Sequence, residues 1–397
     1  MCIIESETTM QPSRRQLLKS AAVLLVSAWA NAQGAAFAQI PPPAATRKVI
    51  VVACGGMRRS DTFSISGAQN IPHLYRDLLP QSVFYPWMQN AGVTSHFNTI
   101  SSILTGQWQR LDDWGKTAPV SPTFFERARK QYNLGQEQAW LISSNKALSS
   151  KIGASSVREY GPAYGANVVF PKQLLINAVV RAASEGRPVH SADRSSVQPE
   201  IEAMLSRDNY DGLGWSVFGE NSMLDPKTLG AIEGAIAELV RTNAPATGDE
   251  FTYLVSLEVM RRFAPSLLVV TFSDMEVAHF GSYAMHLAGI RTVDRLVHEL
   301  WNEVQAQPAY KNNTTLFVLP EFGRDADGSS TNGFFNHRQN DPSTRMTWMM
   351  CLGEAARKAQ IIEQPAAHTS VYATISRLLN FAKSGDASQP PLAGLSL

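Results

Sequence analysis

Charge is scarce in this 397-residue chain, and the charge that is present is balanced. Only 17% of the residues are charged, and 35 Lys and Arg against 34 Asp and Glu leave a formal net charge of +1. A protein without a basic field is a poor partner for nucleic acid or for an anionic membrane surface. We therefore expect neither kind of partner.

Cysteine is equally scarce, since the chain has three, too few for a disulfide framework. Cys54 and Cys351 each end an apolar run that is typical of a β-strand, whereas Cys2 lies near the start of the chain. Buried thiols are common in such strands. We interpret Cys54 and Cys351 as free core thiols, with a disulfide between them as the alternative.

The N-terminal apolar run, residues 21–32, is too short to cross a bilayer, which takes roughly 20 apolar residues. We do not expect a membrane-embedded protein. The run follows SRRQLLK at residues 13–19 and precedes Ala36-Phe37-Ala38. This order resembles a twin-arginine export signal, covering residues 1–38. It implies transport by the twin-arginine machinery to the periplasm or the exterior; a basic tail before a buried helix is the alternative.

Two apolar strands joined by one long helix form the unit around which the chain is organised. SLLVVTF and TTLFVLP predict strands that end near residues 272 and 320. Apolar residues at alternating steps of four and three predict a helix over 283–307 and one buried face on it, made of Tyr283, Leu287, Ile290, Val293, Val297, Leu300 and Val304. A strand, a helix and a strand make a βαβ unit with parallel strands. Ligands gather at the carboxyl ends of such strands. The side chains that fall there are Asp274, Glu276, His279, Glu321, Arg324 and Asp325.

The remaining patterns predict an α/β fold, with a mainly parallel sheet sandwiched between helices. The apolar run at 48–53, broken by Gly55 and Gly56, is typical of a central parallel strand. Further strands are predicted at 139–143 and 346–352, and helices at 122–132, 250–263 and 368–381. We expect residues 39–46 to form a linker, residues 47–385 the α/β domain, residues 151–249 an insertion or cap within it, and residues 386–397 a tail.

Carboxylates and imidazoles that converge from several strand ends suit a divalent metal ion. Asp274 and His279 follow one strand, while Glu321 follows the next and precedes His337 by sixteen residues. Solvated loop residues and helix caps are the alternative interpretation of this pattern. His286 and His298 lie within the long helix and are interpreted as structural.

Five segments carry a more specific signal. They read, in order, VIVVACGGMRRSDTF, HFNTISSILTG with SPTFFERARK, SDMEVAHFGSYAMHLAGIRTVDRLVHEL, TLFVLPEFGR and TSVYATISRLLN. Their order and spacing resemble the alkaline phosphatase superfamily, which includes sulfatases and phosphodiesterases, and most closely a branch of twin-arginine-exported bacterial proteins of unassigned function. The resemblance implies an alkaline phosphatase-like fold. It also implies hydrolysis of phosphate or sulfate esters by two metal ions and a Ser, Thr or formylglycine nucleophile.

The resemblance keeps one metal site and alters the other. The residues expected to bind metal are Asp274, His279, Glu321 and His337, with zinc as the favoured ion and manganese or calcium as alternatives. In the altered site, the first Asp of the family falls on Gly55, and its Asp-His pair falls on Glu321 and Phe322. A single-metal or otherwise changed site is therefore expected.

The nucleophile is also changed, because the position that is usually Thr or Cys falls on His96. We expect His96, Asp61 and Arg324 to act as base or anion-binding groups, although Asp61 could cap a turn and Arg324 could be an ion-pair partner. The leading hypothesis is an exported metal-dependent hydrolase of small-molecule or glycan esters, in which water attacks directly. The alternative is a non-catalytic exported binding protein with the same fold.

Overall fold

A computed structural model describes residues 47–111, 117–144, 151–171, 247–328, 333–383, 385 and 387–397. The expected export signal and linker lie outside the described residues, as does residue range 172–246 of the expected insertion.

Nine strands of the described chain form one sheet, in the order β4-β3-β5-β1-β6-β7-β2-β8, with β9 paired to β2. The strands are β1 (Lys48–Cys54), β2 (Val83–Gln89), β3 (Ala139–Ser143), β4 (Asn167–Val169), β5 (Leu267–Phe272), β6 (Thr314–Pro320), β7 (Met346–Gly353), β8 (Gln360–Ile361) and β9 (Ala366–Ala367). β1 runs parallel to β5 and to β6, whereas β7 is antiparallel to both β6 and β2. This confirms the predicted mainly parallel sheet, and it places β1 between the two strands of the predicted βαβ unit.

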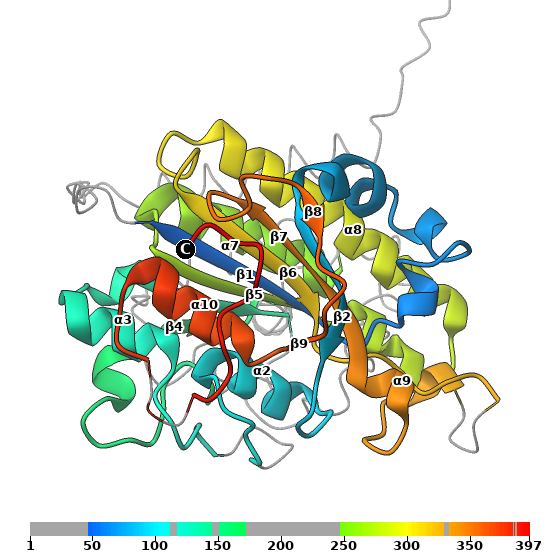
Figure 1. Ribbon diagram of the computed structural model, residues 1–397, viewed down its shortest axis with the longest axis horizontal. Helices are drawn as coiled ribbons and strands as arrows, with labels where there is room; N and C mark the ends of the chain where they lie inside the picture. Colours follow the sequence, from blue (N-terminus) through cyan, green and yellow to red (C-terminus); the bar gives the residue numbers. More distant parts are fainter. Residues whose placement is uncertain are drawn as a thin grey trace, which may run out of the picture. The chain divides into compact units, whose positions relative to one another are not determined.

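Helices cover both faces of the sheet (Figure 1). They are α2 (His96–Thr105), α3 (Phe124–Tyr132), α7 (Gly248–Phe263), α8 (Tyr283–Ala306), α9 (Pro342–Arg345) and α10 (Ser370–Leu379), with the short helices η3 (Leu74–Leu78), η7 (Asp274–Phe280) and η8 (Gly333–Phe335). α2, α3 and α10 lie on one face, and α7 and α8 on the other. Val49 and Val51 of β1 share a core with Phe97 of α2 and Tyr372 of α10. Because side chains alternate along a strand, the residues between them face α7 and α8, which explains why β1 is apolar throughout.

The long helix α8 confirms the predicted helix, but its buried stripe begins later than predicted. Tyr283 is exposed and Leu287 is only partly buried. In the first turns the buried positions belong to His286 and Gly289, which face η7. From there the predicted apolar residues are all buried, namely Ile290, Val293, Val297, Leu300 and Val304.

The start of α3 differs from the prediction, and the strand β2 was not predicted. α3 begins at Phe124 because Thr123 caps it: the Thr123 hydroxyl accepts from the Glu126 N–H, and the Glu126 carboxylate accepts from the Thr123 N–H at 2.7 Å. Pro122, the first residue of the predicted helix over 122–132, therefore precedes the helix. β2 escaped prediction because Pro86 interrupts it, at a shift in its pairing with β7.

Cys54 of β1 and Cys351 of β7 are both buried and free, as interpreted from the sequence. β6 lies between their two strands.

Among the described helices, none combines the length and the apolar character that a membrane span requires.

Candidate metal centre

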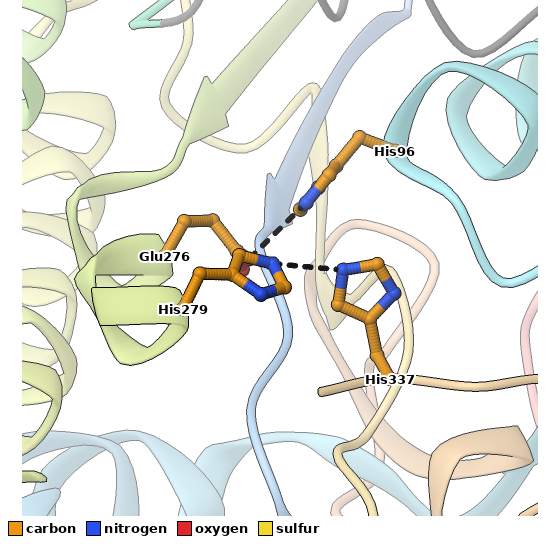
Figure 2. A group of neighbouring side chains, drawn as sticks. All are labelled: His96, Glu276, His279 and His337. Carbon is orange, nitrogen blue, oxygen red and sulfur yellow. Dashed lines mark hydrogen bonds and ion pairs between the residues drawn. The ribbon is translucent and has the colours of Figure 1, made fainter. Parts of the chain in front are cut away.

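Four side chains from three parts of the chain point toward one another beyond the carboxyl ends of the central strands (Figure 2). His96 opens α2, Glu276 and His279 lie in η7 directly after β5, and His337 lies in the loop between η8 and α9. Each offers one ligand atom, and the four atoms all lie within 4.8 Å of one another. We call these four residues the His3Glu cluster.

The separations within the His3Glu cluster fit a small metal ion. Oε2 of Glu276 is 3.2 Å from Nε2 of His96 and 3.2 Å from Nε2 of His279. Nε2 of His279 and Nε2 of His337 are 3.1 Å apart. Ligand atoms bound to a tetrahedral zinc ion lie about 3.3 Å from one another, since each is about 2.0 Å from the metal. These three separations, and the donor types of the cluster, are compatible with a zinc ion.

His337 is held in the form that binds metals. Its Nδ1 lies 2.7 Å from the carbonyl oxygen of Thr94, and because a carbonyl only accepts, Nδ1 carries the hydrogen. Burial, together with the nearby positive charge of His96, holds the pKa of His337 well below its usual value. The ring is thus neutral, and its Nε2 presents a lone pair to the centre of the cluster.

His96 is clamped between two carboxylates. Its Nδ1 lies 2.6 Å from Oε2 of Glu321, while its Nε2 faces Glu276. Burial disfavours the imidazolium, but the charges of Glu276 and Glu321 outweigh this and raise the pKa of His96 to about 10. In the metal-free protein His96 is therefore an imidazolium, and a metal ion would replace the proton on Nε2.

Glu276 is an ionised carboxylate with fixed orientation. Burial raises its pKa, yet the positive charges of Arg324 and His96 outweigh burial and hold the pKa well below its usual value. Its Oε1 accepts from the N–H of Gly56 at 2.6 Å, and its Oε2 accepts from Nη2 of Arg324 at 2.5 Å. A Cβ atom on Gly55 would lie 2.5 Å from Oε1 of Glu276. The space beside Gly55, where the family resemblance implies an Asp, is thus filled by a carboxylate from η7.

Two residues that the sequence singles out, Glu321 and Arg324, form hydrogen bonds to members of the His3Glu cluster. Glu321 contacts Nδ1 of His96, and burial raises the pKa of its carboxyl, with the charge of His96 partly opposing this. Arg324 is fully buried, and besides Glu276 its guanidinium donates to the carbonyl oxygens of Gly56 at 2.9 Å and of Phe334 at 3.2 Å. Arg324 is therefore placed to orient Glu276.

Asp274 lies outside the His3Glu cluster, although the sequence suggested it as a ligand. Its Oδ2 accepts from the N–H of Asp249 at 2.9 Å, and Oδ2 of Asp249 accepts from the N–H of Asp274 at 3.0 Å. Burial and the neighbouring negative charge of Asp274 raise the pKa of Asp249 well above its usual value. The pair joins the start of α7 to the start of η7.

Asp61 also lies in a different network. It is buried and accepts from Arg58 at 2.8 Å, from the hydroxyl of Tyr283 at 2.8 Å and from Nε2 of His286 at 3.3 Å. Burial opposes ionisation, but the hydrogen bonds from His286 and Arg58 outweigh it and lower the pKa of Asp61 to about 2. This network ties the loop after β1 to the first turns of α8, with His286 also bonded to the carbonyl of Met275.

Glu276 is a member of the His3Glu cluster that was not among the metal ligands expected from the sequence. A signal was present, because Glu276 precedes His279 by three residues and residues three apart align on a 3-10 helix. Asp274, five positions before His279, faces elsewhere. Phe322, which stands where the family expects a histidine, packs its ring 4.2 Å from that of His337 and 4.8 Å from that of His96, measured between ring centroids.

The sheet, its helices and the place of the cluster define an α/β fold of alkaline phosphatase type. A protein in the alkaline phosphatase superfamily from Vibrio parahaemolyticus superposes with a TM-score of 0.52 at 11% identity, over 96% of this chain and 80% of that one. The alkaline phosphatase PafA gives 0.53 at 10% identity, over 88% and 99%. The PsFucS1 sulfatase from Pseudoalteromonas sp. gives 0.51 at 12% identity, over 97% and 75%. No family profile and no curated protein matches the sequence.

Proposed function

We propose that this chain is an exported metal-dependent hydrolase of phosphate or sulfate esters, acting on small molecules or glycans through a single metal ion. The observation that carries the proposal is the convergence of four ligand atoms in the His3Glu cluster. Three imidazoles and one carboxylate favour zinc, with manganese as the alternative, and they fit poorly with calcium, which takes oxygen ligands. When bound, such an ion supplies Lewis-acid polarisation of an ester oxygen.

The surrounding residues hold the ligands in the geometry that a metal ion needs. Glu321 fixes the ring of His96, the Thr94 carbonyl fixes that of His337, and Arg324 fixes Glu276. Such outer contacts set the ring orientation and raise the basicity of a ligand. The side chain of His279 is 24% exposed, against 9% for His96. Substrate therefore approaches on the side of His279.

The hydrogen bonds of the neighbouring hydroxyl groups favour direct attack by water over a covalent intermediate formed on one of these hydroxyls. The hydroxyl of Thr94 donates to the carbonyl of His337 at 2.8 Å. The hydroxyl of Thr99 accepts from Asn90 at 2.8 Å and lies 3.3 Å from the carbonyl of Val93. Both hydroxyls are thus engaged in holding the loop, and the residue at the position of the family nucleophile is the clamped His96.

Export is proposed from the sequence, since residues 13–19 and the apolar run that follows resemble a twin-arginine signal. That route implies a periplasmic or secreted protein that is folded before export. A metal ion would then be acquired in the cytoplasm.

The test is metal content, measured by plasma mass spectrometry on untagged protein exported through its own signal and purified without chelators. We expect about one equivalent of zinc or another divalent ion, lost in Glu276→Ala and in His337→Ala. Hydrolysis of p-nitrophenyl phosphate and p-nitrophenyl sulfate should then require that ion. Folded wild-type protein with no metal above background overturns the proposal.

One observation favours a second candidate, a non-catalytic binding protein with the same fold. Four protein ligands complete a tetrahedral shell, and closed shells of this kind are usual at structural zinc sites. A full equivalent of tightly bound metal, with neither ester hydrolysed from pH 6 to 9, decides for this candidate.

A further inference from the structure

A second group of metal-binding side chains lies where η3 packs against the middle of α8. Both carboxylate oxygens of the buried Asp294 accept backbone N–H groups at the start of η3, from His73 at 3.1 Å and from Leu74 at 2.7 Å. His298 follows Asp294 by one helical turn, and Asp77 follows His73 by four residues. The capping contact therefore brings His73, Asp77 and His298 together.

The three side chains are close enough to share one ion. Nδ1 of His73 lies 2.8 Å from Oδ2 of Asp77, and Nε2 of His298 lies 3.7 Å from the same oxygen. One ligand atom from each residue lies within 4.8 Å of the other two. The side chains of His73, Asp77 and His298 are 39%, 46% and 25% exposed, so an ion can reach them from solvent.

We propose that His73, Asp77 and His298 form a second, surface site for one transition-metal ion of the zinc to copper class. Two imidazoles and a carboxylate are ligands that such ions prefer, and three protein ligands leave room for water in the shell. Neither histidine takes part in the His3Glu cluster.

The site must rearrange slightly to bind. The two imidazole rings are stacked, with centroids 4.4 Å apart and planes 3° apart. A ligand lone pair lies in the plane of its ring, so two parallel rings must tilt to meet at one ion. Nε2 of His298 must also give up a 3.4 Å contact with the side-chain amide of Asn302. Because this reorganisation costs free energy, we expect weaker binding than at the His3Glu cluster, whose ligands already converge.

The two sites are physically separate. α8 begins at Tyr283, shortly after His279, and His298 lies fifteen residues further along it, which corresponds to about 22 Å along the helix axis. A metal ion at the surface site would join η3 to α8 without entering the His3Glu cluster. It should stabilise the folded protein by binding, and leave ester hydrolysis unchanged.

The experiment uses untagged protein whose His3Glu cluster is already filled. Zinc is titrated by calorimetry into wild type, His73→Gln, His298→Gln and the control Arg76→Gln, which changes an exposed non-ligand in η3. We expect one further equivalent in wild type and in Arg76→Gln, with a raised Tm, and affinity at least tenfold lower in each histidine variant. Circular dichroism checks that each variant is folded.

Two results overturn the proposal. One is the absence of a further zinc equivalent in wild type. The other is zinc affinity in His73→Gln and His298→Gln that equals the affinity of wild type, which assigns the extra zinc to other surface groups. Because the metal content of the His3Glu cluster is measured separately on the same samples, failure here is distinguishable from failure of the proposed hydrolase.

Discussion

Nδ1 of His96 and Oε2 of Glu321 lie 2.6 Å apart, at a place where both side chains are almost completely shielded from solvent. The contact turns the other ring nitrogen of His96 toward Glu276. A carboxylate that bonds the outer nitrogen of an imidazole fixes its tautomer and makes its inner nitrogen a better ligand. We therefore expect Glu321 to act on a ligand of the proposed metal ion and not to bind the ion itself.

Replacing Glu321 by Gln should weaken metal binding without abolishing it. The amide oxygen can still accept from Nδ1 of His96, but the negative charge is lost. Loss of such an outer partner typically costs 10-fold to 100-fold in metal affinity. Competition with a chelator of known affinity measures the change. Glu363→Gln, at a surface carboxylate bonded to Trp87, is the control and should bind metal as wild type does. Total loss of the metal in Glu321→Gln would instead make Glu321 a direct ligand.

The choice between Glu276 and Asp274 as the metal-binding carboxylate can be tested by a pair of variants. Glu276→Ala removes the oxygen shared by His96 and His279, so the bound metal should be lost. Asp274→Ala removes the acceptor of the Asp249 N–H and a negative charge beside Asp249, but no atom of the His3Glu cluster. We expect Asp274→Ala to keep the metal and to lower the free energy of unfolding by roughly 1 kcal/mol.

Metal analysis and urea unfolding are made on the same samples of both variants. The reverse pattern, with metal lost in Asp274→Ala and kept in Glu276→Ala, would restore the ligand set that the family resemblance implies.

Most of the central fold was predictable because its signals are local. The apolar runs of β1, β5 and β6 and the periodicity of α8 are each complete within one segment of the sequence. β2 was missed because Pro86 breaks its pattern, and β8 and β9 because two residues carry no periodicity. The position of β1 between β5 and β6 depends on pairing between distant segments, which no local pattern encodes.

The sequence predicted most of the residues that come together at the site, but not the role of each carboxylate. His279 and His337 come together as expected, and His96 joins them from α2. The role of each carboxylate depends on the side of the short helix η7 from which it projects. Glu276 projects toward His279 and the cluster, whereas Asp274 projects toward the start of α7. Counting residues after a strand does not distinguish those directions unless the 3-10 geometry of η7 is known.

The stability of the metal-free protein should fall at alkaline pH because of His96. The pKa of His96 is about 10 in the folded protein, against about 6.5 when unfolded. A raised pKa contributes stability that is complete below pH 6.5 and disappears as the pH rises through 10. Metal affinity should rise over the same range, because the ion competes with the proton on Nε2.

Lys48 changes the stability in the opposite direction as the pH rises, so its effect has to be separated from that of His96. Burial lowers the pKa of Lys48 to about 8, so its cost to folding disappears as the pH rises above 8. Thermal unfolding of metal-free wild type and His96→Gln is therefore compared from pH 6 to pH 10. The difference in Tm between the two should shrink steadily with rising pH. A difference that stays constant would mean that His96 is neutral throughout.

The seat of η7 on α8 depends on Gly289, and Gly289→Ala should disturb both stability and metal binding. Helix propensity alone favours Ala over Gly by about 1 kcal/mol. A Cβ atom at this position, however, would lie 2.8 Å from both the backbone nitrogen and the Cα of Met275. Backbone cannot rotate away as a flexible side chain can, and overpacking of this kind costs roughly 1 to 3 kcal/mol. We therefore expect the steric term to win and Tm to fall.

The metal should report the same displacement, because Met275 directly precedes Glu276 and η7 also carries His279. Pushing η7 away from α8 moves two of the four ligands, so affinity for zinc should fall together with Tm. The control is Ala288→Gly, at the exposed neighbouring position. It should lower Tm through helix propensity and leave zinc affinity unchanged. A raised Tm with unchanged affinity in Gly289→Ala would mean that propensity dominates and that η7 does not rest on α8 at this point.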